Sequence, residues 1–171
     1  MDLPLLFLPV HIVCLELVIH PTAMLAFQDL PAAGPLAAVR HRRRARFFSA
    51  DSWSAIVLVG GLLSVAVVWS YLYALGADRD VPHARAMALS VLLTASAGIT
   101  AGLTKLRQAT SRWLVVGTLA SVGALVQIPL LSRLLSLRPL HGADGALLVA
   151  VFAASAVITL AVAARLNRHL D

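Results

Sequence analysis

The fold class of this chain is decided by the stretch LPLLFLPVHIVCLELVIHPTAMLAF, residues 3–27. The stretch is long and apolar enough to cross a bilayer as a helix, which takes about 20 such residues. It nevertheless contains a glutamate, two histidines and three prolines, one of them, Pro21, well inside the stretch. A carboxylate at bilayer depth costs on the order of 2.5 to 3.5 kcal/mol on insertion scales. We therefore expect the glutamate to face the interior of a helix bundle or a water-filled cavity.

The rest of the chain repeats the apolar pattern. Hydrophobic residues make up 60% and charged residues 13% of the composition, and the mean hydropathy is +0.87. We therefore predict an all-α integral membrane protein, a bundle of five transmembrane helices, because backbone groups inside a bilayer must be paired within each segment. The predicted spans are residues 3–27, 53–75, 86–103, 113–131 and 146–164, with a basic cytoplasmic loop at 28–52.

The basic residues predict the orientation. Ten of the 14 Lys and Arg residues fall in the loop at 28–52, in the connection after the third span or in the C-terminal tail. The other four flank the second and fourth connections. Since cytoplasmic segments carry the excess of Lys and Arg, we expect the N-terminus outside and the C-terminus in the cytoplasm.

Charge and cysteine content exclude some functions. The net charge is +6, but the basic residues lie beside the apolar blocks and leave no soluble domain that could form a binding face. We therefore expect no nucleic-acid partner. The run RHRRRAR, residues 40–46, is either a topology signal at the lipid headgroups or a site for anionic lipid or a partner. Cys14 is the single cysteine, so an intrachain disulfide cannot form.

Two further features concern helix packing. Gly98 and Gly102 form a GxxxG pattern in the third span, which is typical of close helix contacts within a bundle. Pro129, late in the fourth span, predicts a kink.

The polar residues of the first span form the candidate ion site. Glu16 and His20 are four residues apart and so share one face of a helix, where they could hold a cation or exchange a proton. Pro21 has no N–H to donate to the carbonyl of Leu17, and its ring clashes with that carbonyl, so we expect the helix to kink or unwind there. Freed carbonyls beside Glu16 become candidate ion ligands.

Structural roles remain open for each of these residues. Glu16 could be a hydrogen-bonding residue between helices, and His20 a histidine satisfied within the bundle. His11 is expected to be structural or interfacial. A zinc site on Glu16 and His20 lacks further ligands in the other spans, which offer mainly Ser, Thr and Gln127.

Three stretches resemble cation-transporting P-type ATPases. LPVHIVCLELVIHPTAMLAFQ, residues 8–28, is similar to the sixth membrane helix of that family, and HARAMALSVLL, residues 83–93, to the eighth. VQIPLLSRLLSLRPL, residues 126–140, resembles the segment that leaves the ninth helix. The resemblance covers nearly the whole chain and implies the C-terminal membrane domain of a pump, from the sixth to the tenth helix.

The resemblance also implies a set of ion ligands. The family binds its cation on an unwound sixth helix through an Asn, a Thr and an Asp, whose positions are occupied here by Glu16, Ile19 and His20. Ile19 offers only its backbone carbonyl, as does Leu17. Because calcium prefers six to eight oxygen ligands, imidazole beside carboxylate suits a transition metal or a proton better. The identity of the transported cation stays open.

The partners follow from what this chain lacks. The family's phosphorylated aspartate in a DKTGT-like motif and its nucleotide-binding domain precede the fifth helix, and the chain contains neither. We expect no ATPase activity and no cofactor in this chain alone, with ATP and Mg bound by the catalytic part. The expected partners are the lipid bilayer and the remaining helices and cytoplasmic domains of the pump, in the plasma membrane. The alternative is a stand-alone five-helix interaction or accessory subunit without transport activity.

Overall fold

The computed structural model describes residues 4–28, 50–78 and 80–168, and the side chains at 19–28, 50–52, 77–78 and 166–168 lie outside this description. Helices are the regular structure of the described residues, as predicted. Their bounds are α1 (Pro9–Gln28), α2 (Ala50–Asp78), α3 (Val81–Thr104), α4 (Ala109–Gln127), α5 (Pro129–Leu134) and α6 (Gly142–Arg168).

Among the described residues, four helices are long and apolar enough to cross a membrane. These segments are Trp53–Gly76, Val81–Thr104, Ala109–Gln127 and Gly142–Arg165. In α1 the apolar part with described side chains is the shorter segment Pro9–Val18. The chain is an integral membrane protein whose helices form a bundle.

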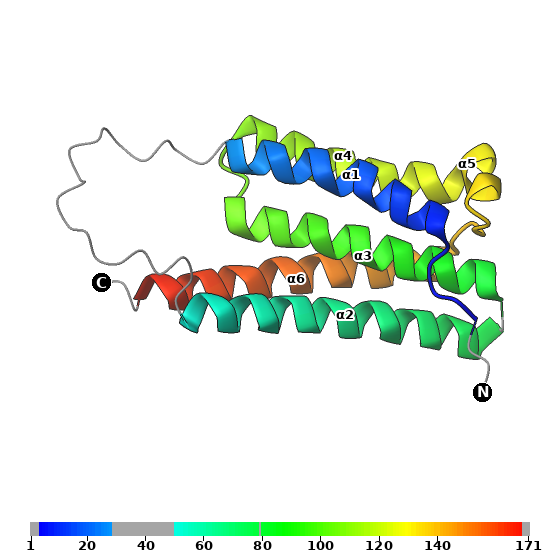
Figure 1. Cartoon of the computed structure of the whole chain (residues 1–171), viewed down its shortest axis with the longest axis horizontal. Helices are drawn as coiled ribbons and strands as arrows, with labels where there is room; N and C mark the ends of the chain where they lie inside the picture. The colour runs from blue at the N-terminus through cyan, green and yellow to red at the C-terminus, as the bar shows by residue number, and fades with distance from the viewer. Residues whose placement is uncertain (1–3, 29–49, 79, 169–171) are drawn as a thin grey trace.

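The centre of the bundle is α3. It packs against α2, α4 and α6, and more lightly against α1, so that it lies between two groups of helices (Figure 1). In its most apolar window 72% of the residues are buried, against 6% to 33% for the other three long helices. The outer faces of those helices can contact lipid or other protein, since apolar side chains need not be buried within the protein when lipid surrounds them.

The close approach of α3 and α6 depends on the predicted glycine pair. A Cβ placed on Gly98 would lie 2.6 Å from the carbonyl oxygen of Phe152, and one on Gly102 would lie 2.7 Å from that of Ala156. Neither distance is tolerated by a real side chain. The GxxxG pattern therefore packs helices within this bundle, as predicted.

The two ends of the bundle carry different connections. The N-terminal residues, the α2–α3 connection and the segment with α5 lie at one end, which we call the N-terminal end (Figure 1). The C-terminus and the α3–α4 connection, with Lys105 and Arg107, lie at the opposite end. The structure thus has the alternating connectivity that the predicted orientation requires.

The first helix differs from its prediction at its start and at Pro21. It begins at Pro9 and not at residue 3, because proline is favoured in the first helical turn and disfavours helix in the residue before it. At Pro21 we predicted a kink or unwinding, and of these the unwinding is absent, because α1 continues as a helix through that position. A proline removes a single backbone hydrogen bond, which a membrane helix accommodates without leaving helical geometry.

The fourth predicted span, residues 113–131, is interrupted where a kink was expected. The helix α4 ends at Gln127, Ile128 is extended (φ −79°, ψ 118°), and α5 starts at Pro129. Steric contact with the proline ring drives the preceding residue out of the helical region. The result is a break and a separate short helix at the N-terminal end.

Candidate functional site

One side of α1 is packed and the other is exposed. Cys14, Leu15 and Val18 contact the buried cluster that includes Leu89 and Leu93 of α3. The opposite stripe is exposed in this chain, and it consists of Ile12, Val13, Glu16 and Leu17. These four positions recur at helical spacing, so they form one continuous face.

The candidate ion ligands divide between described and undescribed side chains. Glu16 lies on the exposed stripe of α1, and Leu17 beside it is 75% exposed. The side chains of Ile19 and His20 lie outside the described residues, although the backbone there is helical. The structure therefore places Glu16 on an uncovered face and leaves the predicted pairing with His20 as a prediction.

His11 is a structural residue, as the sequence suggested. Its side chain is fully buried, its Nε2 lies 2.6 Å from the carbonyl oxygen of Leu135, and its Nδ1 accepts a hydrogen bond of 3.2 Å from the N–H of Leu8. Nδ1 as acceptor requires the tautomer in which Nε2 carries the hydrogen and donates it to Leu135. With both nitrogens paired, His11 caps the start of α1 and joins it to the end of α5.

The polar residues of α3 do not extend the ion site. Ser96 and Thr100 donate their hydroxyl hydrogens to the carbonyls of Leu92 and Ser96, four residues earlier in the same helix. Thr94 is buried. An apolar groove between α2, α3 and α6 is lined chiefly by Val, Leu, Ile and Ala side chains and includes none of the candidate ligands.

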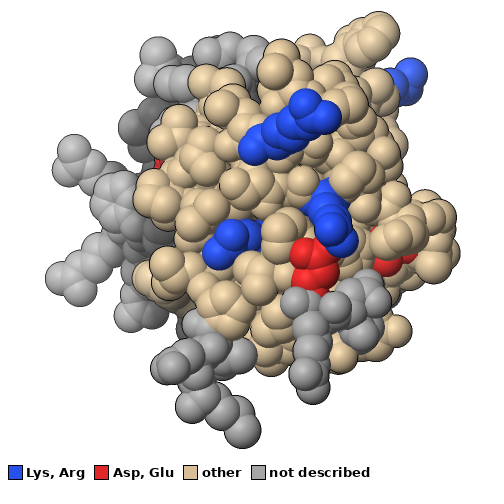
Figure 2. Space-filling model, turned by 90° about the vertical axis from the view of Figure 1, so that its right-hand side faces the viewer, with Lys and Arg blue, Asp and Glu red and all other residues tan. Residues whose placement is uncertain are grey.

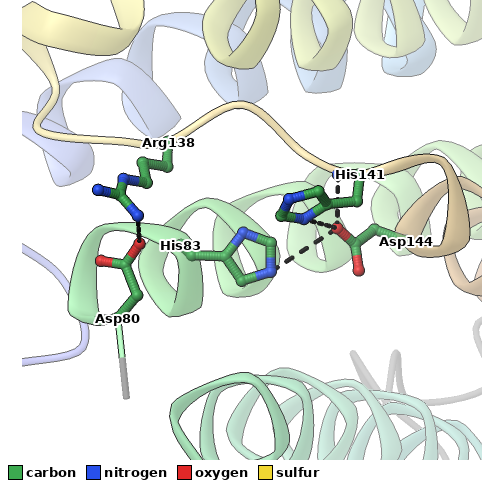
Figure 3. Close-up of polar contacts among 5 residues, drawn as sticks. All are labelled: Asp80, His83, Arg138, His141 and Asp144. Atoms are coloured by element: carbon green, nitrogen blue, oxygen red, sulfur yellow. Dashed lines mark hydrogen bonds and ion pairs between the residues drawn. The ribbon is translucent and has the colours of Figure 1, made fainter. Parts of the chain in front are cut away.

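The structure gathers a second polar group that the sequence reasoning missed. His83, in the first turn of α3, lies beside His141 and Asp144 at the start of α6 (Figure 3). Next to them Arg138 and Asp80 form an ion pair of 2.7 Å. A signal was present in the sequence: both histidines border connections predicted to lie on the same side of the membrane.

The charges at the N-terminal end are mixed. Figure 2 shows basic and acidic side chains lying close together on a surface that is otherwise mainly uncharged. This contrasts with the concentration of Lys and Arg that the sequence assigns to the loop at 28–52, which lies outside the described residues. The N-terminal end of the bundle therefore carries neighbouring side chains of opposite charge and not an extended basic surface.

The comparisons with known proteins identify the family. Over residues 4–166 the sequence matches the family described as "Cation transporting ATPase, C-terminus". No curated protein matches the chain, and no solved structure matches it. The match takes in all six helices almost to their last residue, with the buried α3 and the open face of α1 both inside it. The chain therefore belongs to the family of C-terminal membrane domains of cation-transporting P-type ATPases.

Proposed function

We propose that this chain is the membrane-domain portion of a cation-transporting P-type ATPase in which α1 carries the ion-binding residues. The remaining helices serve as the scaffold against which α1 moves. The observation that carries this proposal is the exposed stripe of α1, on which a carboxylate stands among apolar side chains.

The stripe needs a protein surface to cover it. Ile12, Val13 and Leu17 could face lipid at no cost, whereas an exposed carboxylate on the same face favours contact with protein or a water-filled cavity over contact with lipid. The family supplies such a surface in the pump's other membrane helices. Packing against them would enclose Glu16 in a cavity between the two halves of the membrane domain.

The ligands that we propose are Glu16 and His20 through their side chains and Leu17 and Ile19 through their carbonyls. Pro21 supports this even in a continuous helix, because it has no N–H to donate to the carbonyl of Leu17. That oxygen lies on the same helix turn as Glu16. A carboxylate, an imidazole and carbonyl oxygens suit a transition metal or a proton better than calcium.

Energy coupling is assigned to the rest of the pump. ATP and Mg would bind the catalytic part, whose conformational cycle would move α1 against α3 and α4. The transported cation is the substrate of this chain. We propose the plasma membrane as the location.

The test uses the polypeptide that carries this chain, assayed for ion-stimulated ATP hydrolysis and phosphoenzyme formation with a panel of single cations. Glu16→Gln keeps the shape of the side chain and removes its charge. We expect it to abolish ion dependence, and we expect His20→Asn to weaken it. The matched control is Asp80→Asn, the same chemical change in a connection at the bundle end, which should leave ion dependence intact. Unchanged ion dependence in Glu16→Gln would refute the proposal.

The mass of the native polypeptide separates this function from that of an accessory subunit. An antibody against the tail ARLNRHLD, residues 164–171, would detect a band several times larger than 18.1 kDa if the chain is part of an intact pump. A band at 18.1 kDa would favour a separately made subunit, and co-purification would then identify the protein that supplies the catalytic part.

A further inference from the structure

We propose that His83, His141 and Asp144 form a binding site for a divalent transition metal, with Zn²⁺ as the best-fitting ion, at the N-terminal end of the bundle. The site shares no residue with the proposed ion ligands on α1. Its success or failure is therefore independent of the proposed function.

The three side chains converge from two connections. His83 enters from the first turn of α3, while His141 and Asp144 flank the start of α6 (Figure 3). One ligand atom from each residue lies within 4.8 Å of the other two. The Asp144 Oδ2 atom is 3.7 Å from His83 Nε2 and 3.7 Å from His141 Nδ1.

These distances are close to those that a bound ion requires. Zinc binds histidine nitrogen and carboxylate oxygen at about 2.0 to 2.2 Å, so tetrahedral ligands stand roughly 3.3 to 3.6 Å apart. Both oxygen-to-nitrogen distances only slightly exceed this spacing. Since His141 is 75% exposed and can adjust its rotamer, the group can close around an ion without moving either helix.

The carboxylate is held in place by its own helix. Asp144 accepts a 2.8 Å hydrogen bond from the N–H of His141, and the Asp144 N–H donates to the His141 carbonyl at 3.1 Å. The first of these bonds is the half of a capping box in which the third helical residue accepts from the N-cap N–H, and it fixes the orientation of the Asp144 side chain. Capping uses one of the carboxylate's lone pairs and leaves others for a metal.

The two buried histidines of the described structure differ in a way that favours ligation at His83. Both nitrogens of His11 have hydrogen-bond partners. His83 is 5% exposed, its Nδ1 has no partner among the described residues, and its Nε2 faces Asp144 beyond hydrogen-bond distance. Nε2 is the nitrogen that faces Asp144 and is therefore the proposed ligand atom, and ligation there would place the imidazole hydrogen on Nδ1.

The neighbouring charges leave Asp144 available. Arg138 pairs with Asp80 at 2.7 Å and so neutralises that neighbouring carboxylate. The site then offers two imidazoles and one carboxylate, with a fourth position for water on the exposed side of His141. This donor set favours zinc and its neighbours in the first transition series over calcium or magnesium, which prefer oxygen ligands.

A bound ion would tie the start of α3 to the start of α6. These two helices already meet along their length at Gly98 and Gly102, and the metal would fix their ends at the same surface. We therefore expect the bound ion to raise the thermal stability of the bundle, because a ligand that binds the folded state alone stabilises it.

The test is a titration of the polypeptide carrying this chain, without a histidine tag and reconstituted in lipid nanodiscs, with ZnCl₂ in a calorimeter. We expect one bound equivalent that depends on His141 and Asp144, in addition to any ion held by the proposed ligands on α1. His141→Ala and Asp144→Asn should each weaken that binding by at least roughly tenfold, the lower bound for losing even an outer partner of a metal ligand. Asp144→Asn keeps an acceptor for the cap, and His141 is exposed, so both variants are expected to fold.

Two controls decide the outcome. His41→Ala removes a histidine from the basic loop and should leave the affinity unchanged. Co²⁺ in place of Zn²⁺ should give the visible absorption of a tetrahedral site in the wild type and lose it in His141→Ala. Absence of stoichiometric binding would overturn the proposal, and so would equal binding by wild type, His141→Ala and Asp144→Asn.

Discussion

The Nε2 atom of His11 lies 2.6 Å from the carbonyl oxygen of Leu135, a residue 124 positions further along the chain. Leu135 follows α5 and has a buried side chain, so its carbonyl has no access to bulk water. The bond connects the first turn of α1 to the segment that returns toward α6. It fixes the helix that carries Glu16 at the N-terminal end of the bundle.

Replacing His11 should therefore destabilise the bundle. His11→Ala leaves the Leu135 carbonyl and the Leu8 N–H without their partner, at a cost of about 1 to 3 kcal/mol. His11→Gln should recover part of this loss, because glutamine at the third helical position can still accept from the N–H of Leu8. Thermal unfolding in detergent, followed by circular dichroism, measures both. Equal melting temperatures for His11→Ala and the wild type would show that the bond contributes nothing.

The four long apolar helices could be predicted from the sequence because length and hydropathy are local properties. The four long helices follow from uninterrupted apolar runs, and Gly98 with Gly102 indicated a close contact before the partner helix was known. The sequence indicated that Pro21 and Pro129 would disturb their helices, but it did not indicate which form the disturbance would take. A proline leaves two outcomes open, accommodation within a helix as at Pro21 or a break as at Ile128, and packing around it decides between them.

The contacts between distant segments could not be predicted. Nothing local distinguishes His83, which lies in a cluster with His141 and Asp144, from His11, which is paired with backbone. The difference depends on which loop residues face each helix end, and that is a property of the assembled bundle. The same limit applies to Glu16: its chemistry was evident from the sequence, while its place on the uncovered face of α1 required the structure.

Bulky substitution at Gly98 should separate α3 from α6. In Gly98→Leu the side chain would meet the Phe152 carbonyl and the Ser155 side chain, so we expect a loss of at least about 1 to 3 kcal/mol from overpacking. Gly117→Leu in α4 is the matched control, because a Cβ there meets no atom within 4 Å. Melting temperatures of the two variants should differ by several degrees. If Gly117→Leu is as unstable as Gly98→Leu, close packing is not the cause.

The ion pair between Arg138 and Asp80 should contribute little to stability despite its short distance. The Arg138 side chain is 69% exposed, and exposed pairs are worth about 0.2 to 1 kcal/mol because water and salt screen them. A double-mutant cycle with Arg138→Ala and Asp80→Asn, measured by thermal unfolding at low and high salt, should give a small coupling that falls as salt rises. A large coupling that salt leaves unchanged would show that the pair is shielded from water, contrary to this expectation.

The predicted orientation of the bundle, which rests on the distribution of basic residues, can be measured directly. Ser136 and Arg107 are both exposed and lie in connections at opposite ends, Ser136 at the N-terminal end. In a background where Cys14 is replaced by Ala, Ser136→Cys should react with a membrane-impermeant maleimide on intact cells. Arg107→Cys should react only after permeabilisation, because the segments rich in Lys and Arg stay in the cytoplasm. The reverse pattern would contradict the predicted orientation and would place the cluster of His83, His141 and Asp144 on the cytoplasmic side. The cluster could then not bind a metal ion from outside the cell.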